Sequence, residues 1–132
     1  MAASIPKEFQ DILEKKSFVH LATKMRDGSP QVSPVWVEYD GKYIVVNSAK
    51  GRLKDRNMRA DDRVALSATD PDNPYRALMV RGRITKITED GADEHIDSLA
   101  KKYLNEDKYP FRNPEEVRVK YYIEPVKVAT MG

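Results

Sequence analysis

The sequence predicts a mainly β domain of the α+β class: a small antiparallel barrel of six to seven strands with peripheral helices. Three observations support this prediction. About six segments are rich in β-branched and aromatic residues, Asp-Gly pairs suited to tight turns separate several of them, and only three segments have helical character. Because 132 residues are the length of one domain, we expect a single domain over residues 1–132.

The expected elements follow from periodicity and turn residues. Helices are predicted over residues 6–16, 51–60 and 92–104. Strands are predicted over residues 18–23, 30–39, 42–47, 63–69, 77–88 and 117–130. Turn signals at Asp27-Gly28 and Asp40-Gly41 join the first three strands, which we expect to form a meander.

Prolines and glycines predict the local irregularities. Ser4 and Pro6 suit the start of the first helix, with Ser4 as its cap. The two prolines within residues 70–74 predict a loop. Gly82 predicts a bend or bulge, and Pro125 predicts a bulge or an edge position in the last strand.

Composition excludes several classes of protein and site. The absence of cysteine excludes disulfides, thiolate metal sites and a cysteine nucleophile, and it suits a cytoplasmic location. With 23 Lys and Arg against 21 Asp and Glu, the net charge of +2 gives no field for gripping nucleic acid. A mean hydropathy of -0.67 and the lack of a long apolar run argue against a membrane span, and charges at Lys7, Glu8 and Asp11 argue against a signal peptide.

The most informative segment covers residues 47–57. It follows a strand, turns at Gly51 and opens a helix, and free N–H groups at a helix N-terminus bind phosphate readily. Ser48 adds a hydroxyl donor. The segment also carries four cations, Lys50, Arg52, Lys54 and Arg56. A solvated helix face is the alternative interpretation, because the segment has no Walker or Rossmann fingerprint.

Two further places could contact a flat ligand. Pro34 cannot donate a strand hydrogen bond, so a bulge or edge there would leave backbone N–H groups for the polar rim of a planar ring. Trp36 could pack on such a ring or fill the core. Tyr75 and Arg76 could stack on a ligand, close an interface, or be ordinary surface residues.

The remaining candidates have structural explanations. Lys101 and Lys102 at the end of a helix complement its dipole. The loop over residues 109–112 could cover a pocket or anchor itself to the barrel. His20 and His95 stand on different elements and are predicted to be structural or solvated, with no metal site. Catalytic residues remain unassigned, so an enzyme of this sequence would depend on an organic cofactor.

Seven short motifs together resemble a known family. They follow one another over nearly the whole chain: His20-Leu-Ala-Thr23, Asp27-Gly-Ser-Pro-Gln-Val-Ser-Pro-Val-Trp36, Lys50-Gly-Arg-Leu-Lys-Asp-Arg-Asn57, Asp62-Arg-Val-Ala-Leu66, Asp70-Pro71, Val80-Arg-Gly82 and Leu99-Ala-Lys-Lys-Tyr103. Their order and spacing resemble the pyridoxamine 5′-phosphate oxidase-like proteins. The similarity is greatest to the small deazaflavin-dependent reductase branch of that family.

The resemblance implies a split β-barrel of the FMN-binding type, a homodimer with FMN or coenzyme F420 bound at its interface. It assigns the ring to Ser33, Pro34, Val35 and Trp36, and the ribityl chain or ring edge to Asn47 and Ser48. It assigns the phosphate and any anionic tail to Lys50, Arg52, Lys54 and Asn57, with Tyr75 and Arg76 reaching in from the partner chain.

The expected function is an F420H2-dependent oxidoreductase that passes a hydride to an electron-poor small molecule, such as a conjugated double bond or a quinone. Six basic residues favour the longer anion of F420 over FMN: Lys50, Arg52, Lys54, Arg56, Arg59 and Arg63. The alternatives are an FMN-binding oxidoreductase of the same family and a non-catalytic flavin- or F420-binding module. Vitamin B6 oxidation is not expected, because the sequence ends soon after its last strand.

Overall fold

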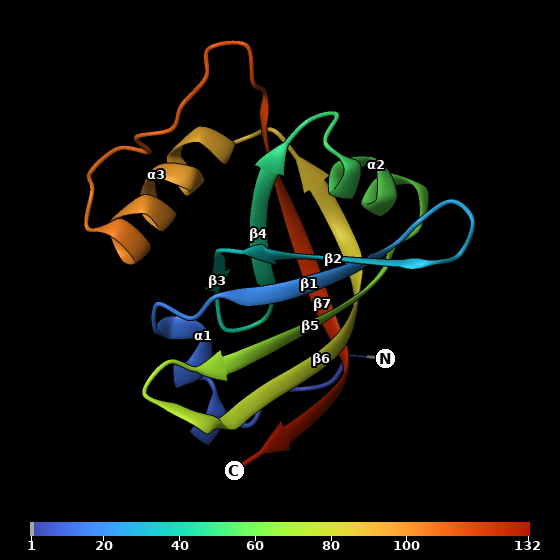
Figure 1. Ribbon diagram of the computed structural model, residues 1–132, viewed down its shortest axis with the longest axis vertical. Helices are drawn as coiled ribbons and strands as arrows, with labels where there is room; N and C mark the ends of the chain where they lie inside the picture. The colour runs from blue at the N-terminus through green and yellow to red at the C-terminus, as the bar shows by residue number, and fades with distance from the viewer. Residues whose placement is uncertain (1) are drawn as a thin grey trace.

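Seven antiparallel strands form one curled sheet in the computed structural model, which describes residues 2–132 (Figure 1). The strands are β1 (Val19–Lys24), β2 (Pro30–Val35), β3 (Val37–Tyr39), β4 (Ile44–Ala49), β5 (Arg63–Asp70), β6 (Asn73–Thr88) and β7 (Arg118–Met131). The helices are the 3-10 turn η1 (Lys7–Phe9), α1 (Asp11–Glu14), α2 (Leu53–Ala60) and α3 (Ala92–Leu104). The predicted split-barrel α+β fold is confirmed.

The sheet closes on itself at Trp36. Its strand order is β2-β1-β5-β6-β7-β4-β3, so the two edge strands are consecutive in the chain and only Trp36 separates them. The sheet must therefore curl until its edges meet (Figure 1). The turns predicted at Asp27-Gly28 and Asp40-Gly41 are confirmed, because β1 pairs with β2 and β3 pairs with β4. The predicted continuous strand over 30–39 is wrong, because it breaks at Trp36, and the three predicted strands therefore form no continuous meander. The N–H of Val37 is taken by the hydroxyl of Tyr103 instead of by a strand.

The first helix is shorter than predicted. Residues 6–16 form a 3-10 turn followed by a single α-helical turn, and no side chain caps either, so the predicted cap by Ser4 is wrong. The apolar side of the segment is as expected, with Ile5, Ile12 and Leu13 buried in the main core. These side chains close one end of the curled sheet, where α1 packs against β3 and β5.

A bulge bends the longest strand pair where glycine and proline predict one. Arg81 pairs with Lys127 and Gly82 pairs with Pro125, which leaves Val126 as the extra residue of β7. A Cβ on Gly82 would lie 2.7 Å from the side chain of Ile123, so only glycine fits. The predicted bulge is confirmed.

The predicted loop over 70–74 is wrong, because β6 begins already at Asn73. Only Pro71 and Asp72 turn the chain. A carboxylate oxygen of Asp70 accepts a hydrogen bond of 2.9 Å from the backbone N–H of Asp72, which makes the turn tight enough for the strands to pair directly.

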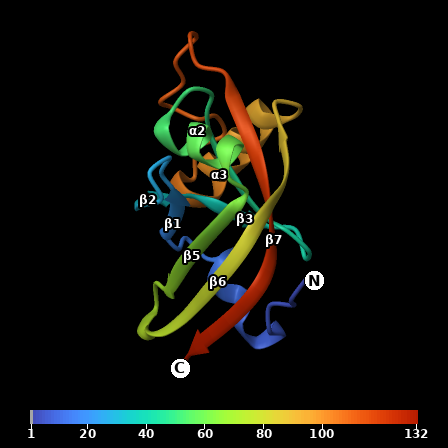
Figure 2. The ribbon, with the colours of Figure 1, turned by 90° about the vertical axis from the view of Figure 1, so that its right-hand side faces the viewer.

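Helix α3 matches its predicted bounds and builds a second, smaller core outside the curl. Ile96, Leu99 and Tyr103 pack together with Trp36 and Tyr109. In both ribbon views α3 and α2 lie at one end of the molecule, while the turn between β5 and β6 lies at the other (Figures 1 and 2). None of the helices within residues 2–132 is long and apolar enough to cross a membrane.

Candidate cofactor pocket

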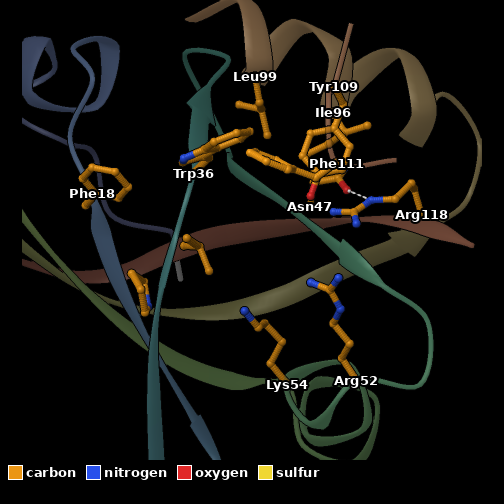
Figure 3. A pocket seen from close by; sticks show the side chains of 12 residues that line it. Phe18, Trp36, Asn47, Arg52, Lys54, Ile96, Leu99, Tyr109, Phe111 and Arg118 are labelled. Carbon is orange, nitrogen blue, oxygen red and sulfur yellow. Dashed lines mark hydrogen bonds between the residues drawn. The ribbon is translucent and has the colours of Figure 1, made fainter. Parts of the chain in front are cut away.

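A pocket lies between α3, the loop over 105–117, strand β4 and the start of α2 (Figure 3). Its cavity volume is about 210 Å³. Twelve residues line it: Phe18, Pro34, Val35, Trp36, Asn47, Arg52, Lys54, Ile96, Leu99, Tyr109, Phe111 and Arg118. One wall is apolar and aromatic. A second, cationic wall starts at Arg118, beside the ring of Tyr109, and continues across the pocket with Arg52 and Lys54 (Figure 3).

Aromatic rings form the apolar wall. Trp36 stacks on Tyr103 with 5.2 Å between ring centroids and 7° between planes, and Tyr109 meets Trp36 edge-on at 6.1 Å. Phe18 and Phe111 border the pocket and remain 63% and 67% exposed. Such flat, apolar surfaces suit the face of a planar ring.

Two residues at the end of α3 hold the chain at this wall. The Tyr103 hydroxyl accepts from the N–H of Val37 at 3.2 Å and donates to the carbonyl of Ser17 at 2.7 Å. The ammonium of Lys102 donates to the carbonyls of Leu13 and Val37 at 2.5 and 2.7 Å. Burial lowers the pKa of Lys102 to about 8. Lys102 lies in the last turn of α3 as predicted, and its ammonium also holds α1 and β3 to that helix.

The cationic wall gathers three basic side chains. A carboxylate of Glu116 joins two of them, accepting from Arg52 at 2.7 Å and from Arg118 at 3.0 Å. Lys54 is half-buried and forms no salt bridge with any of residues 2–132. Burial, together with the charges of Arg52 and Arg118, lowers the pKa of Lys54. Two of the three cations share one carboxylate, and among the described residues Lys54 is left without one, so the wall attracts an anion.

A buried carboxylate fixes the turn that carries Arg52 and Lys54. Asp55 accepts hydrogen bonds from the N–H of Gly51 at 2.9 Å, from the Tyr121 hydroxyl at 2.5 Å and from Arg59 at 2.9 Å. Burial alone would raise the pKa of Asp55, but these donors hold it below its usual value. The turn needs Gly51, whose φ is +91°.

Half of the sequence-predicted site residues line the pocket. Those that do are Pro34, Val35, Trp36, Asn47, Arg52 and Lys54. Those that do not are Ser33, Ser48, Lys50, Asn57, Tyr75 and Arg76. The predicted role of both groups in binding stays a prediction.

Strand alternation and local pairing explain the residues outside the pocket. Asn47 faces the pocket, so its neighbour Ser48 faces the other side of β4. Its hydroxyl and that of Ser33 are buried and have no hydrogen-bond partner among residues 2–132. Asn57 is buried and donates to a hydroxyl of β1, and Lys50 points to Glu89 at 3.3 Å.

Tyr75 and Arg76 lie far from the pocket of their own chain. They stand beside the β5–β6 turn, at the opposite end of the molecule from α2 and α3 (Figures 1 and 2). The guanidinium of Arg76 is held by the carboxylates of Asp11 and Asp70 at 2.8 and 2.9 Å. Tyr75 is 79% exposed. Their predicted action on a partner chain stays a prediction.

Sequence reasoning missed part of the lining. Phe18, Ile96, Leu99 and Arg118 had no local signal beyond ordinary strand or helix positions. The aromatic loop over 109–112 did carry a signal, and Tyr109 and Phe111 do line the pocket.

The two histidines have different surroundings. His20 is exposed on β1, whereas His95 is buried in α3 beside Asn47. No group of three or more His, Cys, Asp or Glu residues within 2–132 is arranged to hold a metal ion.

Comparison with known proteins places this fold in a family. A family model described as pyridoxamine 5′-phosphate oxidase matches residues 5–131. A solved structure titled F420 reductase is 34% identical, with a TM-score of 0.84 over 95% of this chain and 98% of that chain. No curated protein matches the sequence.

Two more distant structures share the fold. A conserved protein from Mycobacterium tuberculosis is 22% identical, with a TM-score of 0.74 over 98% of this chain and 86% of that one. A FAD-binding protein from Mesorhizobium loti is 20% identical, with a TM-score of 0.70 over 98% and 96%. The family model covers nearly the whole sequence, and the chain therefore belongs to the pyridoxamine 5′-phosphate oxidase family.

Proposed function

We propose that this protein is an F420H2-dependent oxidoreductase that reduces an electron-poor small molecule. The observation that carries the proposal is the pairing of an aromatic wall with a cationic wall that holds more positive than negative charge. When bound, the reduced deazaflavin would supply a hydride to a conjugated double bond or a quinone, and the acceptor would also take up a proton.

The residues present fit a flat cofactor with an anionic arm. Trp36 and Tyr109 offer apolar surface to a tricyclic ring. Arg52, Lys54 and Arg118 would hold the phosphate, because charge-assisted hydrogen bonds favour such donors. Lys54 in particular is a half-buried cation whose counter-charge the described residues do not supply.

We assign the proton to solvent. None of the pocket-lining side chains described above is a carboxylate or an imidazole, and the pocket's cationic side chains are assigned to the anionic arm. The protein would thus bind the cofactor and the acceptor and orient them for reaction. The cofactor would supply the redox chemistry.

The relative titled F420 reductase favours F420 as the cofactor, because it is 34% identical over almost the full length of both chains. FMN is the second candidate, since its ring and phosphate require the same two walls and the family model does not separate the two cofactors.

A homodimer would complete the pocket. Pockets for small molecules usually measure about 300–1,000 Å³, so a cavity of about 210 Å³ holds only part of such a cofactor. The exposed rings of Phe18 and Phe111 would be covered by a second copy of the chain. Sedimentation of the protein with and without cofactor tests this part of the proposal.

Titration with F420 and with FMN, followed by cofactor fluorescence, tests the function. The Arg52→Ala/Lys54→Ala variant should lose at least about a hundredfold in affinity, because each lost charge-assisted hydrogen bond costs about 1.5–3 kcal/mol. Arg56→Ala removes a cation from the same helix but outside this pocket, so its affinity should stay within about threefold of the unsubstituted protein.

The titration separates the candidate functions. Tighter binding of F420, followed by turnover with a quinone or an activated alkene, supports the proposal. Tighter binding of FMN favours the second cofactor. Binding without turnover of any acceptor favours a non-catalytic module, and failure to bind either molecule refutes the redox function.

A further inference from the structure

The side-chain amide of Asn47 has all but one of its hydrogen-bonding positions filled. Its Nδ2 donates to the carbonyl of Ala92 at 2.9 Å and lies 3.1 Å from Nδ1 of His95. Its Oδ1 accepts from Nε of Arg118 at 2.9 Å (Figure 3). An amide has two donors and an acceptor oxygen with two lone pairs, so these three partners fill three of four positions and select one of its two orientations.

The contact to Asn47 also selects the state of His95. Since Nδ2 of Asn47 is a donor, Nδ1 of His95 must accept, and the ring proton sits on Nε2. The side chain of His95 is buried, with 5% of its surface exposed. Burial, with the charges of Lys120 and Arg118, lowers the pKa of His95 to about 4.

The groups around the ring come from three elements. Arg118 and Lys120 face it from β7, and Asn47 faces it from β4. From β3, Oε1 of Glu38 lies 3.2 Å from Nε2, although the contact lacks hydrogen-bond geometry. The nitrogen that is well bonded is therefore the one that meets Asn47.

If Nδ1 could not accept, one N–H of the Asn47 amide would be buried without a partner, and only Ala92 and Arg118 would hold the amide. The amide would then tilt toward another acceptor, which would weaken its bond to Nε of Arg118. The guanidinium of Arg118 would depend more on its other contacts, Glu116 at 3.0 Å and the ring of Tyr109 at 5.3 Å. A neutral His95 prevents this change.

We infer that His95 is a positioning residue: by accepting from Asn47 it fixes the amide that holds Arg118 in the cationic wall. The inference rests on the proposed function, because it assigns the effect to the anionic arm of the bound cofactor. His95 itself does not line the pocket and touches no ligand there.

A matched pair of variants tests the inference. His95→Asn keeps a carbonyl oxygen that can accept from Asn47, whereas His95→Leu keeps apolar volume but has no acceptor. FMN and its phosphate-free form, riboflavin, are the probes, and the ratio of their dissociation constants reports on the phosphate contacts alone. Circular dichroism first verifies that both variants fold.

His95→Leu should weaken FMN binding about tenfold, the equivalent of one charge-assisted hydrogen bond, and should change riboflavin binding by less than about threefold. His95→Asn should restore FMN binding to within about threefold of the unsubstituted protein. Equal loss of both probes in His95→Leu, or no loss of FMN binding, overturns the inference.

A second measurement needs no cofactor. The Nε–H proton of Arg118, observed by nuclear magnetic resonance, should exchange slowly in the unsubstituted protein and in His95→Asn but quickly in His95→Leu. Slow exchange in all three overturns the inference. If the unsubstituted protein binds neither F420 nor FMN, the proposed function fails, while this exchange experiment still decides what His95 does.

Discussion

The hydroxyl of Tyr103 joins the chain at the Trp36 junction to the segment before β1, and Tyr103→Phe removes only that hydroxyl. The variant keeps the ring that stacks on Trp36. It leaves two buried groups without partners, the N–H of Val37, which is 0% exposed, and the carbonyl of Ser17, which is 1% exposed.

The expected cost follows from these two groups. A buried polar group that loses its partner costs about 1–3 kcal/mol, so together they should lower the free energy of unfolding by at least about 2 kcal/mol. That is a large part of the roughly 5–15 kcal/mol that stabilises a typical domain. Urea unfolding measures the change, and Trp36 reports on it directly because it is the only tryptophan.

Tyr39→Phe is the matched control. Its hydroxyl donates to the carbonyl of Gly41 at 3.0 Å, but this bond is exposed to water. The control should therefore change stability by less than about 0.5 kcal/mol. If Tyr103→Phe also stays within that margin, the two hydrogen bonds at the Trp36 junction do not hold the sheet closed and our reasoning fails.

Three further predictions concern stability. Lys102→Met tests the lowered pKa of Lys102. Between pH 8 and about 10.4 the folded protein binds fewer protons than the unfolded chain, so its stability rises with pH in that window. The free energy of unfolding of the unsubstituted protein should therefore rise by about 1–2 kcal/mol relative to that of the variant. Gly82→Ala should cost about 1–3 kcal/mol in urea unfolding, because the new Cβ meets Ile123 at 2.7 Å. Asp55→Asn should cost about 2–4 kcal/mol and weaken FMN binding, because the N–H of Gly51 loses a charged acceptor.

Substitutions of two exposed residues provide controls. Lys101→Met changes the exposed neighbour of Lys102 and should not alter the pH dependence. Asp107→Asn removes a carboxylate that is 92% exposed and should be neutral. The Lys102 prediction fails if the stability of Lys102→Met follows pH in parallel with that of the unsubstituted protein. An unchanged urea midpoint contradicts the prediction for Gly82→Ala, and full cofactor affinity contradicts the prediction for Asp55→Asn.

The features that the sequence predicted well depend on local pattern. The period of α3 and the alternation along β7 are visible within a dozen residues, because a helix or a strand places its apolar side chains at fixed intervals. The bulge at Gly82 and Pro125 is also local, since glycine and proline disturb a strand by their own geometry. Arg52 and Lys54, which line the pocket, were predicted as site residues from local pattern too, because they adjoin a turn that opens a helix.

The features that the sequence predicted poorly depend on contacts between distant segments. The segment that contains β2 and β3 has the sequence pattern of one β-rich strand. It breaks at Trp36 because β2 pairs with β1 and β3 pairs with β4, and because the hydroxyl of Tyr103, 66 residues away, binds the N–H of Val37. Likewise Arg118 joins the cationic wall through Asn47, 71 positions earlier in the chain. The periodicity of side chains and the residues that favour turns act over a few positions, so they can be predicted from the sequence alone. The choice of strand partner and the meeting of the two pocket walls depend on distant segments, so they are set only when the curled sheet packs against α3.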